Sequence, residues 1–558
     1  YTAFKNKIGL AINDDTADNF IKTKNDVVLV WPHKDCILEG GQTKEDQEQE
    51  RNEIFWNETL APDNVDRLLD AKAFTNFKKY DKEGEHKISE FKGDENLILK
   101  GNNLLVLSSL LKTHRGEIKL IYIDPPYNTG SDSFQYNDNF NHSTWLTFMK
   151  NRLEIAKELL KDDGVIFVQC DDNEQAYLKV LLDEIFMPSN FVETFVWKNT
   201  DNAPTLSKKS RKNIEFIHCY ERKINKSIDY EGRLSDNDDA PLLNSGNPIT
   251  TLKFKSNLIK FRIPDGEYPK GKFEKVELLE NLVVQNGVNK NDIQLKGRFK
   301  WQQSFLDNEV LNDTYFLIKS DKFSIRYKRG IASNIAPDKL LDETYLSKAI
   351  GVETNEDSKK HIDSLNLKFN SFPKPESLIA FLIRAVTNEN EIVLDFHLGS
   401  GTTAAVAHKM NRRYIGIEQM DYINTVSSER LKKVIEGEQG GISKVVDWQG
   451  GGSFIYAELM EYNQYFINKI QDAKTKVDIL TIWGEMQDKA FISYQFDKDI
   501  FNKSLEAFKT ASLETMQHYL IEVLDKNQLY VNFSEVEDKA FNVSEQDKAL
   551  NYSFYNRK

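Results

Sequence analysis

Cysteine is scarce in this chain, with three residues among 558: Cys36, Cys170 and Cys219. Their odd number and wide spacing exclude a disulfide framework and a cysteine-built zinc site, and they favour a reducing cytoplasm. No run approaches 18 apolar residues, so we predict no membrane-spanning helix. A Gly-x4-Gly-Lys-Ser/Thr phosphate loop is also absent, which argues against ATP hydrolysis. The sequence begins with Tyr1 rather than Met, so we expect natural sequence before it.

Acidic residues outnumber basic ones, and the formal net charge is −13. At this length the chain has room for about three to four domains. The charge is uneven, because residues 251–330 hold sixteen Lys and Arg against ten Asp and Glu, and residues 198–226 hold eight against three. Local charge, more than net charge, decides whether a polyanion binds. The two basic segments are candidate polyanion contacts, and the alternative is that they are solvated basic faces.

The stretch that says most about function is Asp124-Pro125-Pro126-Tyr127, which follows an apolar run. Two consecutive prolines fix φ at about −65° and supply no N–H donor, so the carbonyl of Pro125 projects without a local partner. Together with the Asp124 carboxylate, that carbonyl can accept both hydrogens of an exocyclic amino group and leave its lone pair exposed. Tyr127 offers a flat face for stacking the ring that carries the amine. The alternative is an ordinary turn after a buried strand.

A second motif begins at the apolar run Ile392–Leu394 and continues through Asp395 into a loop with Gly399 and Gly401, where a helix starts. Strand, glycine loop and helix N-terminus in this order let the polar tail of a ligand approach backbone N–H groups closely. The next predicted strand ends in Glu418, at a spacing typical of acids that bind ribose hydroxyls. Gly-x-Gly alone also fits a helix-capping turn, so the inference depends on the whole succession.

Together the two motifs resemble those of the DNA amino-methyltransferases that use S-adenosylmethionine. The DPPY motif comes first and the glycine loop about 270 residues later, which resembles the permuted β group of that family. Two further stretches, Gly101–Leu107 and Phe134–Phe140, are similar to the modification (Mod) subunit of type III restriction–modification systems. The similarity covers residues 96–225 and 366–435 with specific motifs, and the remainder only loosely.

The resemblance implies a Rossmann-like α/β core with a circularly permuted, mixed sheet, an inserted target-recognition domain and α+β terminal domains. The expected regions are an N-terminal docking or dimerisation region at 1–95, the catalytic half of the core at 96–225, the target-recognition domain at 226–365, the cofactor-binding half at 366–440 and a C-terminal interaction domain at 441–558. The basic segments then serve the recognition domain, where contacts to phosphates and base edges are needed.

The resemblance implies that the glycine motif and the acid after the next strand bind S-adenosylmethionine. The residues concerned are Asp395, Phe396, Gly399, Gly401, Thr402 and Glu418. A helix opened by Pro375 and Glu376 closes over the methionine part of the cofactor in this family, which makes Lys374 and Ser377 further candidates. Asn102 is a candidate contact to the cofactor's adenine, although the family usually has Asp at that position. The resemblance implies no metal ion.

The implied reaction is direct methyl transfer to the N6 amine of adenine in double-stranded DNA, with catalytic residues Asp124, Pro125, Pro126 and Tyr127. Trp197 resembles the aromatic residue that helps to hold a flipped base, and the alternative is an ordinary core residue. DPPY in place of SPPY favours adenine, and the cytosine N4 amine stays open as an alternative. By resemblance alone we expect a homodimer, a separate restriction (Res) subunit, no membrane contact and a cytoplasmic location.

Three other functions fit parts of the sequence. A methyltransferase for a protein or small-molecule amide is disfavoured by the long, basic interval between the motifs. A DNA-recognition subunit without turnover is disfavoured because DPPY and the glycine loop are both intact. A fused restriction–modification enzyme is disfavoured by the missing phosphate loop and the lack of a recognisable nuclease pattern.

Overall fold

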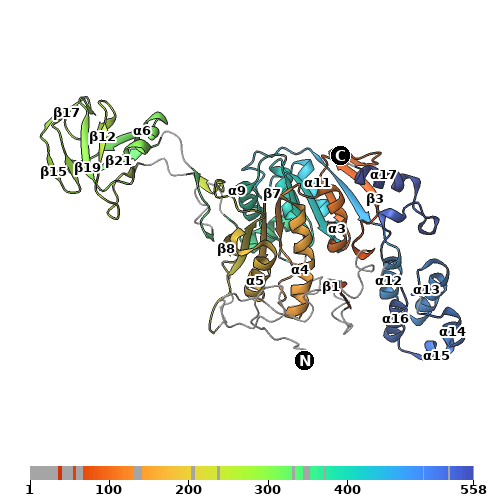
Figure 1. The fold of residues 1–558 in the computed structure, drawn as a ribbon. Helices are drawn as coiled ribbons and strands as arrows, with labels where there is room; N and C mark the ends of the chain where they lie inside the picture. The colour runs from red at the N-terminus through yellow and green to blue at the C-terminus, as the bar shows by residue number, and fades with distance from the viewer. Residues whose placement is uncertain are drawn as a thin grey trace. The chain divides into compact units, whose positions relative to one another are not determined.

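The computed structural model describes residues 36–39, 54–57, 67–129, 141–202, 208–234, 239–329, 334–342, 352–369, 372–493, 496–525 and 528–556. The motif Phe134–Phe140 lies outside the described residues. The chain divides into two compact units, which Figure 1 shows as ribbons. Tyr1–Ile228 and Asp338–Lys558 form the first unit, and Asp229–Pro337 form the second.

The first unit is built around one mixed sheet of eleven strands. In spatial order these are β23 (Leu340–Leu341), β8 (Phe191–Lys198), β9 (Ile214–Glu221), β7 (Leu160–Cys170), β6 (Ile118–Ile123), β24 (Ile392–Asp395), β25 (Arg413–Glu418), β5 (Leu97–Lys100), β26 (Ser453–Leu459), β3 (Phe74–Asp81) and β4 (Gly84–His86). The run from β7 through β26 is parallel, whereas β9 pairs antiparallel with both β7 and β8. A mixed α/β fold, as predicted, is therefore present.

The central strands are continuous apolar runs because both faces of the sheet are covered. Every residue of β6 and of β24 is buried. Such runs are typical of parallel strands with helices on both sides. Leu394 of β24 pairs with Ile121 of β6, so the two sequence motifs follow neighbouring strands.

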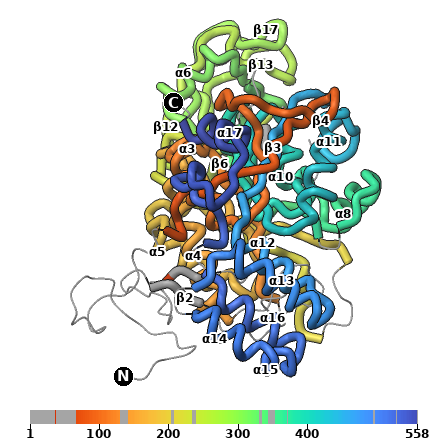
Figure 2. Tube along the Cα trace, turned by 90° about the vertical axis from the view of Figure 1, so that its right-hand side faces the viewer, coloured from red at the N-terminus to blue at the C-terminus, as the bar shows by residue number. Residues whose placement is uncertain are grey.

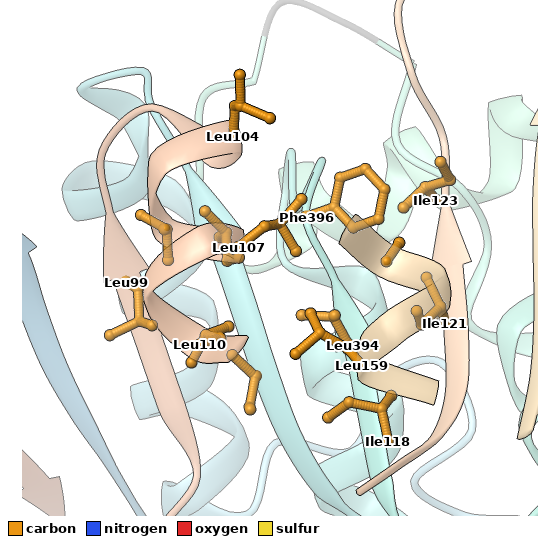
Figure 3. Packing of buried hydrophobic residues seen from close by; sticks show 14 of the residues in the cluster. Leu99, Leu104, Leu107, Leu110, Ile118, Ile121, Ile123, Leu159, Leu394 and Phe396 are labelled. Carbon is orange, nitrogen blue, oxygen red and sulfur yellow. The ribbon is translucent and has the colours of Figure 1, made fainter. Parts of the chain in front are cut away.

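Two helical layers cover the sheet. The first contains α3 (Asn103–His114), α4 (His142–Leu159) and α5 (Gln175–Phe186), and the second contains α9 (Glu376–Val386), α10 (Thr402–Lys409) and α11 (Ser428–Glu436). Strand residues alternate between the two layers. Figure 3 shows Leu99, Ile121 and Leu394 packed with Leu107 of α3 and Leu159 of α4 in the main core. Helix α4 turns its apolar face into this core.

The sheet extends beyond the two core intervals that the sequence suggested. Strands β3 and β4 come from the interval 1–95, and β26 comes from the interval 441–558. β26 lies parallel to β5 through Ile455 and Leu97, and β3 then pairs with β26. These additions cover the open backbone edge of β5, which would otherwise be available for pairing with another chain. A further pair, β1 (Cys36–Glu39) and β2 (Ile54–Asn57), is antiparallel.

The second unit is β-rich and has a hydrophobic core of its own. Its larger sheet contains β11 (Ala240–Pro241), β21 (Ile325–Lys328), β20 (Tyr315–Ile318), β13 (Ile259–Phe261), β18 (Val288–Asn289), β17 (Leu282–Gln285) and β14 (Gly266–Tyr268). Its smaller sheet contains β12 (Thr250–Phe254), β19 (Ile293–Gly297), β16 (Val276–Leu278) and β15 (Gly271–Phe273). The strand pair β10 (Arg233–Leu234) and β22 (Asn334–Ile335) and helix α6 (Gln303–Leu311) complete it.

This second unit is narrower than the interval 226–365 suggested by sequence. Residues after Pro337 return to the first unit, where β23 pairs with β8 and α8 (Asn355–Ser364) lies near the start of α9. The physical reason is that β8 gains a parallel neighbour, through Leu341 opposite Trp197, as soon as the chain re-enters the sheet.

Past β26, the chain forms a helical group with a separate core. Its helices are α12 (Asn463–Asp472), α13 (Lys476–Lys489), α14 (Lys498–Lys503), α15 (Leu505–Thr510) and α16 (Leu513–Glu522), which Figure 2 traces in blue. The last helix, α17 (Glu545–Tyr555), packs back against β3 and α3. Within the described ranges, none of the helices is both long and apolar enough to cross a membrane.

Candidate active site

The two motifs meet where the order of the sheet reverses. From β6 the chain passes through α4 to β7 on one side, and from β24 it passes through α10 to β25 on the other. Ligands of open α/β sheets bind at the carboxyl ends of the strands at such a point. Asp124 directly follows β6, and Asp395 is the last residue of β24. A cleft opens there, with about 630 Å³ of space that includes the part open to solvent.

The cleft is lined by residues of both motifs. Asp124 and Pro126 contribute from the first, and Asp395, Gly399, Ser400, Thr402 and Thr403 from the second, together with Lys374 and Glu418. Sequence reasoning therefore brought together residues that the fold also brings together.

Helix α4 fixes the DPPY turn from behind. The indole N–H of buried Trp145 donates to the carbonyl oxygen of Pro126 at 2.8 Å. Asp124 and the buried Pro126 line the cleft, whereas Pro125 and Tyr127 are not among its lining residues. The Asp124 side chain keeps 24% exposure, so its carboxylate is open to a ligand.

Behind Asp124 lies a buried acid that sequence reasoning missed, Glu215 of β9. The Tyr127 hydroxyl contacts Asp124 Oδ1 and lies 2.9 Å from Glu215 Oε2. Lys374 Nζ lies 2.9 Å from Asp124 Oδ2 and 3.5 Å from Glu215 Oε2. Side-chain amides of Gln169 and Asn199 also donate to Glu215, at 2.6 and 2.8 Å. Two carboxylates, one hydroxyl and one ammonium therefore form a single cluster.

The ionisable groups of this cluster differ in their affinity for a proton. Burial raises the pKa of Asp124 above its usual range, although Lys374 opposes that change. Burial acts in the same direction on Glu215, but the Lys374 ammonium and the two amide donors outweigh it and lower the pKa of Glu215. Burial alone would lower the pKa of Lys374, and the two carboxylates raise it instead. Of the two carboxylates, Asp124 is therefore the one that takes up a proton more readily.

In the glycine loop, two acids organise the backbone. Glu418 Oε2 accepts from the N–H of Gly399 at 3.0 Å, and its Oε1 accepts from the N–H of Met420 at 3.1 Å. Asp395 accepts from the hydroxyl of Thr403 at 2.6 Å and from the N–H of His397 at 2.9 Å. Burial raises the pKa of Glu418 and raises that of Asp395 to about 7. Both carboxylates line the cleft, where each can accept further hydrogen bonds.

The loop glycines occupy the left-handed region, with φ of +54° at Gly399 and +79° at Gly401. A Cβ on Gly401 would lie 3.3 Å from the Cα of Ser427, whereas a Cβ on Gly399 would meet nothing nearer than an oxygen at 3.8 Å. We expect Gly399→Ala to cost about 1 kcal/mol of stability, from backbone strain alone. Gly401→Ala should cost about 2 kcal/mol or more, because crowding adds to the strain. Thermal unfolding of both variants tests this difference, and equal losses would contradict the crowding.

The residues at the start of α9 take positions different from those expected. The Lys374 carbonyl accepts from the hydroxyl of Thr402 at 3.1 Å, which ties it to the glycine loop, but its ammonium points to Asp124. Ser377 is buried beside Glu353, whose backbone N–H donates to its hydroxyl at 2.9 Å. Ser377 is not among the residues that line the cleft.

Three further candidates lie away from the cleft. The side chain of Asn102 caps α3 by accepting from the N–H of Leu104 at 3.0 Å. The ring of Phe396 is completely buried in the main core, as Figure 3 shows. Trp197 is also completely buried, and its indole N–H donates to the carbonyl of Glu353 at 3.3 Å. The alternative for Trp197, a core residue, is therefore the correct one, since a ring without an exposed face cannot stack on a base.

A buried ion cluster holds α9 against α10 and α11. Among the described residues, His361, Glu376 and Glu438 converge closely enough to hold a metal ion. Lys409 is the cation found there, since its Nζ lies 2.7 Å from Glu376 Oε2 and contacts Glu438. Arg430 pairs with the other oxygen of Glu376 at 2.9 Å. The cluster fixes the helix that carries Lys374 beside the glycine loop.

The sequence of this chain is similar to those of known DNA methylases. A family model described as DNA methylase matches residues 118–429. A probable type III restriction–modification enzyme HindVI Mod subunit of Haemophilus influenzae is 37% identical, covering 100% of this chain and 88% of that protein. The type III restriction–modification enzyme EcoPI Mod subunit of Escherichia phage P1 is 30% identical, covering 60% of this chain and 59% of its own length. Among solved structures, the PvuII DNA methyltransferase (cytosine-N4-specific) aligns at 14% identity and a TM-score of 0.33, over 63% of this chain and 91% of that one.

The matched region contains both the DPPY motif and the glycine loop, and it spans more than half of the chain. The Haemophilus relative matches along the whole chain. The resemblance drawn from the two motifs is confirmed: the chain belongs to the N6/N4 DNA methylase family and, within it, to the Mod subunits of type III restriction–modification enzymes.

Proposed function

We propose that the chain is a site-specific DNA methyltransferase that transfers the methyl group of S-adenosylmethionine to the N6 amine of adenine, as the modification subunit of a type III system. The observation that carries this proposal is the single cleft at the switch point of the sheet, lined by DPPY on one side and by the glycine loop on the other. An amine acceptor and a cofactor loop facing one space are what direct transfer between two bound molecules requires.

The residues of the cleft fit S-adenosylmethionine. Its ribose hydroxyls suit a space lined by two acids, Asp395 and Glu418, whose oxygens can accept hydrogen bonds. The open space at Gly399 lets a ligand approach the backbone at the start of α10. Thr402 would hold the cofactor from the helix N-terminus. S-adenosylmethionine, when bound, supplies an electrophilic methyl group to this side of the cleft.

The DPPY side then orients the amine. Asp124 accepts a hydrogen from the exocyclic amino group, so that the nitrogen lone pair points across the cleft. Bound S-adenosylmethionine would supply the methyl group to this nitrogen and would leave as the neutral thioether. The methylated amine would then carry a positive charge, and Asp124 or water would take its extra proton. The raised pKa of Asp124 suits it to that role, and Tyr127 holds the carboxylate in place.

The finer parts of the function rest on the family resemblance and on composition. We propose that the core is circularly permuted and that the β-rich unit Asp229–Pro337 recognises the target sequence. The tetrapeptide DPPY favours adenine, with the cytosine N4 amine as the second candidate. Double-stranded DNA, a second copy of the chain and a Res subunit are the proposed partners.

The direct test is transfer of a labelled methyl group from S-adenosylmethionine to unmethylated bacterial DNA, followed by analysis of the nucleosides. We expect the label in N6-methyldeoxyadenosine, at positions that share one short sequence. Label on cytosine would retain the cleft chemistry and change the target base. If cofactor binds and no label is transferred, the proposal of a methyltransferase is wrong and a recognition subunit without turnover takes its place.

A further inference from the structure

Asp124 already holds a nitrogen donor before any base is present. The ammonium of Lys374 lies 2.9 Å from Asp124 Oδ2, at ordinary hydrogen-bond length. Asp124 and Lys374 both line the cleft, so this contact is made where a target amine would arrive. Because the Tyr127 hydroxyl contacts the other oxygen, Oδ1, an arriving amino group has to share an oxygen that already accepts a hydrogen bond or displace its donor.

The same ammonium has a second carboxylate within reach. Lys374 Nζ lies 3.5 Å from Glu215 Oε2, and the Glu215 side chain is 7% exposed. Glu215 is held rigidly by Gln169, Asn199 and Tyr127. The backbone of Lys374 is equally fixed, because its carbonyl accepts from the hydroxyls of Ser358 and Thr402. Only the flexible side chain of Lys374 has to move to exchange one carboxylate for the other.

We infer that Lys374 is a placeholder for the target amine: its ammonium occupies Asp124 in the free enzyme and shifts to Glu215 when the base enters. This inference rests on the proposed function, and it assigns Glu215 a task as a positioning residue. If so, Lys374 acts on the side of the cleft that binds the target amine. The sequence had suggested that it acts on the cofactor side.

The exchange conserves charge inside a buried site. A neutral amino group replaces the ammonium at Asp124, and the ammonium stays paired because Glu215 receives it. Without a second acceptor, the base would have to expel a buried cation into the cleft, which is costly. In the free enzyme, the ammonium of Lys374 also gives the Asp124 carboxylate a partner of opposite charge, beside the hydroxyl of Tyr127.

Two readings compete with the placeholder. In the first, Lys374 and Glu215 form a fixed structural pair and the ammonium is never displaced. In the second, Lys374 binds the cofactor, as the sequence suggested. The three differ in what happens when Glu215 loses its charge. Only if Lys374 is a placeholder does the loss of the Glu215 charge make its ammonium harder for the base to displace from Asp124.

A double-mutant cycle in the full-length protein separates them. The variants are Glu215→Gln, Lys374→Met and the double variant, and the matched control is the exposed pair Glu193 and Lys339 on the same sheet, 2.9 Å apart. The assays are kcat and KM for DNA carrying the mapped methylation site, and the Kd of S-adenosylmethionine by calorimetry. Cofactor binding also reports whether each variant is folded.

We expect Glu215→Gln to raise KM for DNA about tenfold, because the ammonium is now held by Asp124 alone. Lys374→Met should lower KM for DNA, and adding it to Glu215→Gln should restore KM to within about threefold of Lys374→Met alone. Cofactor Kd should stay within about twofold throughout, and the control pair should change nothing.

Effects that multiply in the double variant would overturn the placeholder, because a fixed pair gives no rescue. A Kd for S-adenosylmethionine raised about tenfold by Lys374→Met would overturn it as well, and would return Lys374 to the cofactor site. An unmodified protein that binds cofactor without methylating DNA would refute the proposed function and this inference together. If the unmodified protein methylates DNA normally but the double variant shows no rescue of KM, only the inference about Lys374 is refuted.

Discussion

Replacement of Asp124 by alanine is expected to slow methyl transfer to DNA by at least about a thousandfold, with the Kd of S-adenosylmethionine changed by no more than about threefold. The carboxylate of Asp124 is open to the cleft, and in the proposed mechanism it aims the amine and can accept its proton. The glycine loop, by contrast, is held by Asp395 and Glu418 and does not depend on Asp124. Single-turnover transfer of labelled methyl, with calorimetric cofactor binding, measures the two effects separately.

Two further variants sharpen this prediction. Asp124→Asn keeps one acceptor oxygen and loses the proton acceptor, so it should fall between the wild type and Asp124→Ala. Asp183 is a matched control, because it too accepts from a tyrosine and a lysine, Tyr220 and Lys179, but on α5 and not among the residues of the cleft. Asp183→Ala should lower stability and leave transfer within about twofold. Turnover by Asp124→Ala near that of Asp183→Ala would refute the assignment of Asp124.

The two motifs were predictable because each is local. In DPPY, the prolines determine the turn regardless of what surrounds it, and in the glycine loop the succession of strand, turn and helix is continuous in sequence. Their meeting was predictable only through the family resemblance, since it depends on β24 pairing with β6. Sequence spacing alone carries no information on which strands are neighbours.

The residues that contact Asp124 could not be predicted from the sequence, for the same reason. Tyr127 and Glu215 are 88 residues apart, and their contact requires β9 to lie antiparallel beside β7. Glu215 did leave one signal, an acid in a strand that is otherwise largely apolar, Ile214–Glu221. A buried acid needs a partner, so such a position marks a candidate for a polar cluster.

For two aromatic residues, the sequence suggested a functional role that the structure does not support. Trp197 and Phe396 lie next to functional segments, and both rings are completely buried. The sequence looks the same whether a large ring fills the core or lines a cleft. Which of the two occurs depends on which face of the strand is covered by other elements. Asn102 likewise has a local use, as the cap of α3, that its sequence position did not distinguish from ligand binding.

The pH dependence of stability should carry the signature of Asp395. Its carboxyl is 3% exposed, and burial raises its pKa from 3.8 to about 7. In the unfolded chain the group loses its proton near pH 4, whereas in the folded protein it keeps the proton up to about pH 7. The folded state therefore binds more protons between these values, and its stability falls as the pH rises.

The loss is expected to reach about 4 kcal/mol across the window from about pH 4 to about pH 7, since a tenfold change in proton affinity is worth about 1.4 kcal/mol. Asp395→Asn removes the titrating group, so the stability of the variant relative to the wild type should rise as the pH increases from about 4 to about 7. Calorimetric unfolding of both proteins over this range measures the difference in slope. Asp163→Asn is the control that should show no such slope, because Lys119 lowers the pKa of that half-exposed carboxyl, which is therefore ionised in both states over this range. Parallel curves for the wild type and Asp395→Asn would mean that Asp395 is ionised throughout, and its place beside the glycine loop would then require a permanent positive partner.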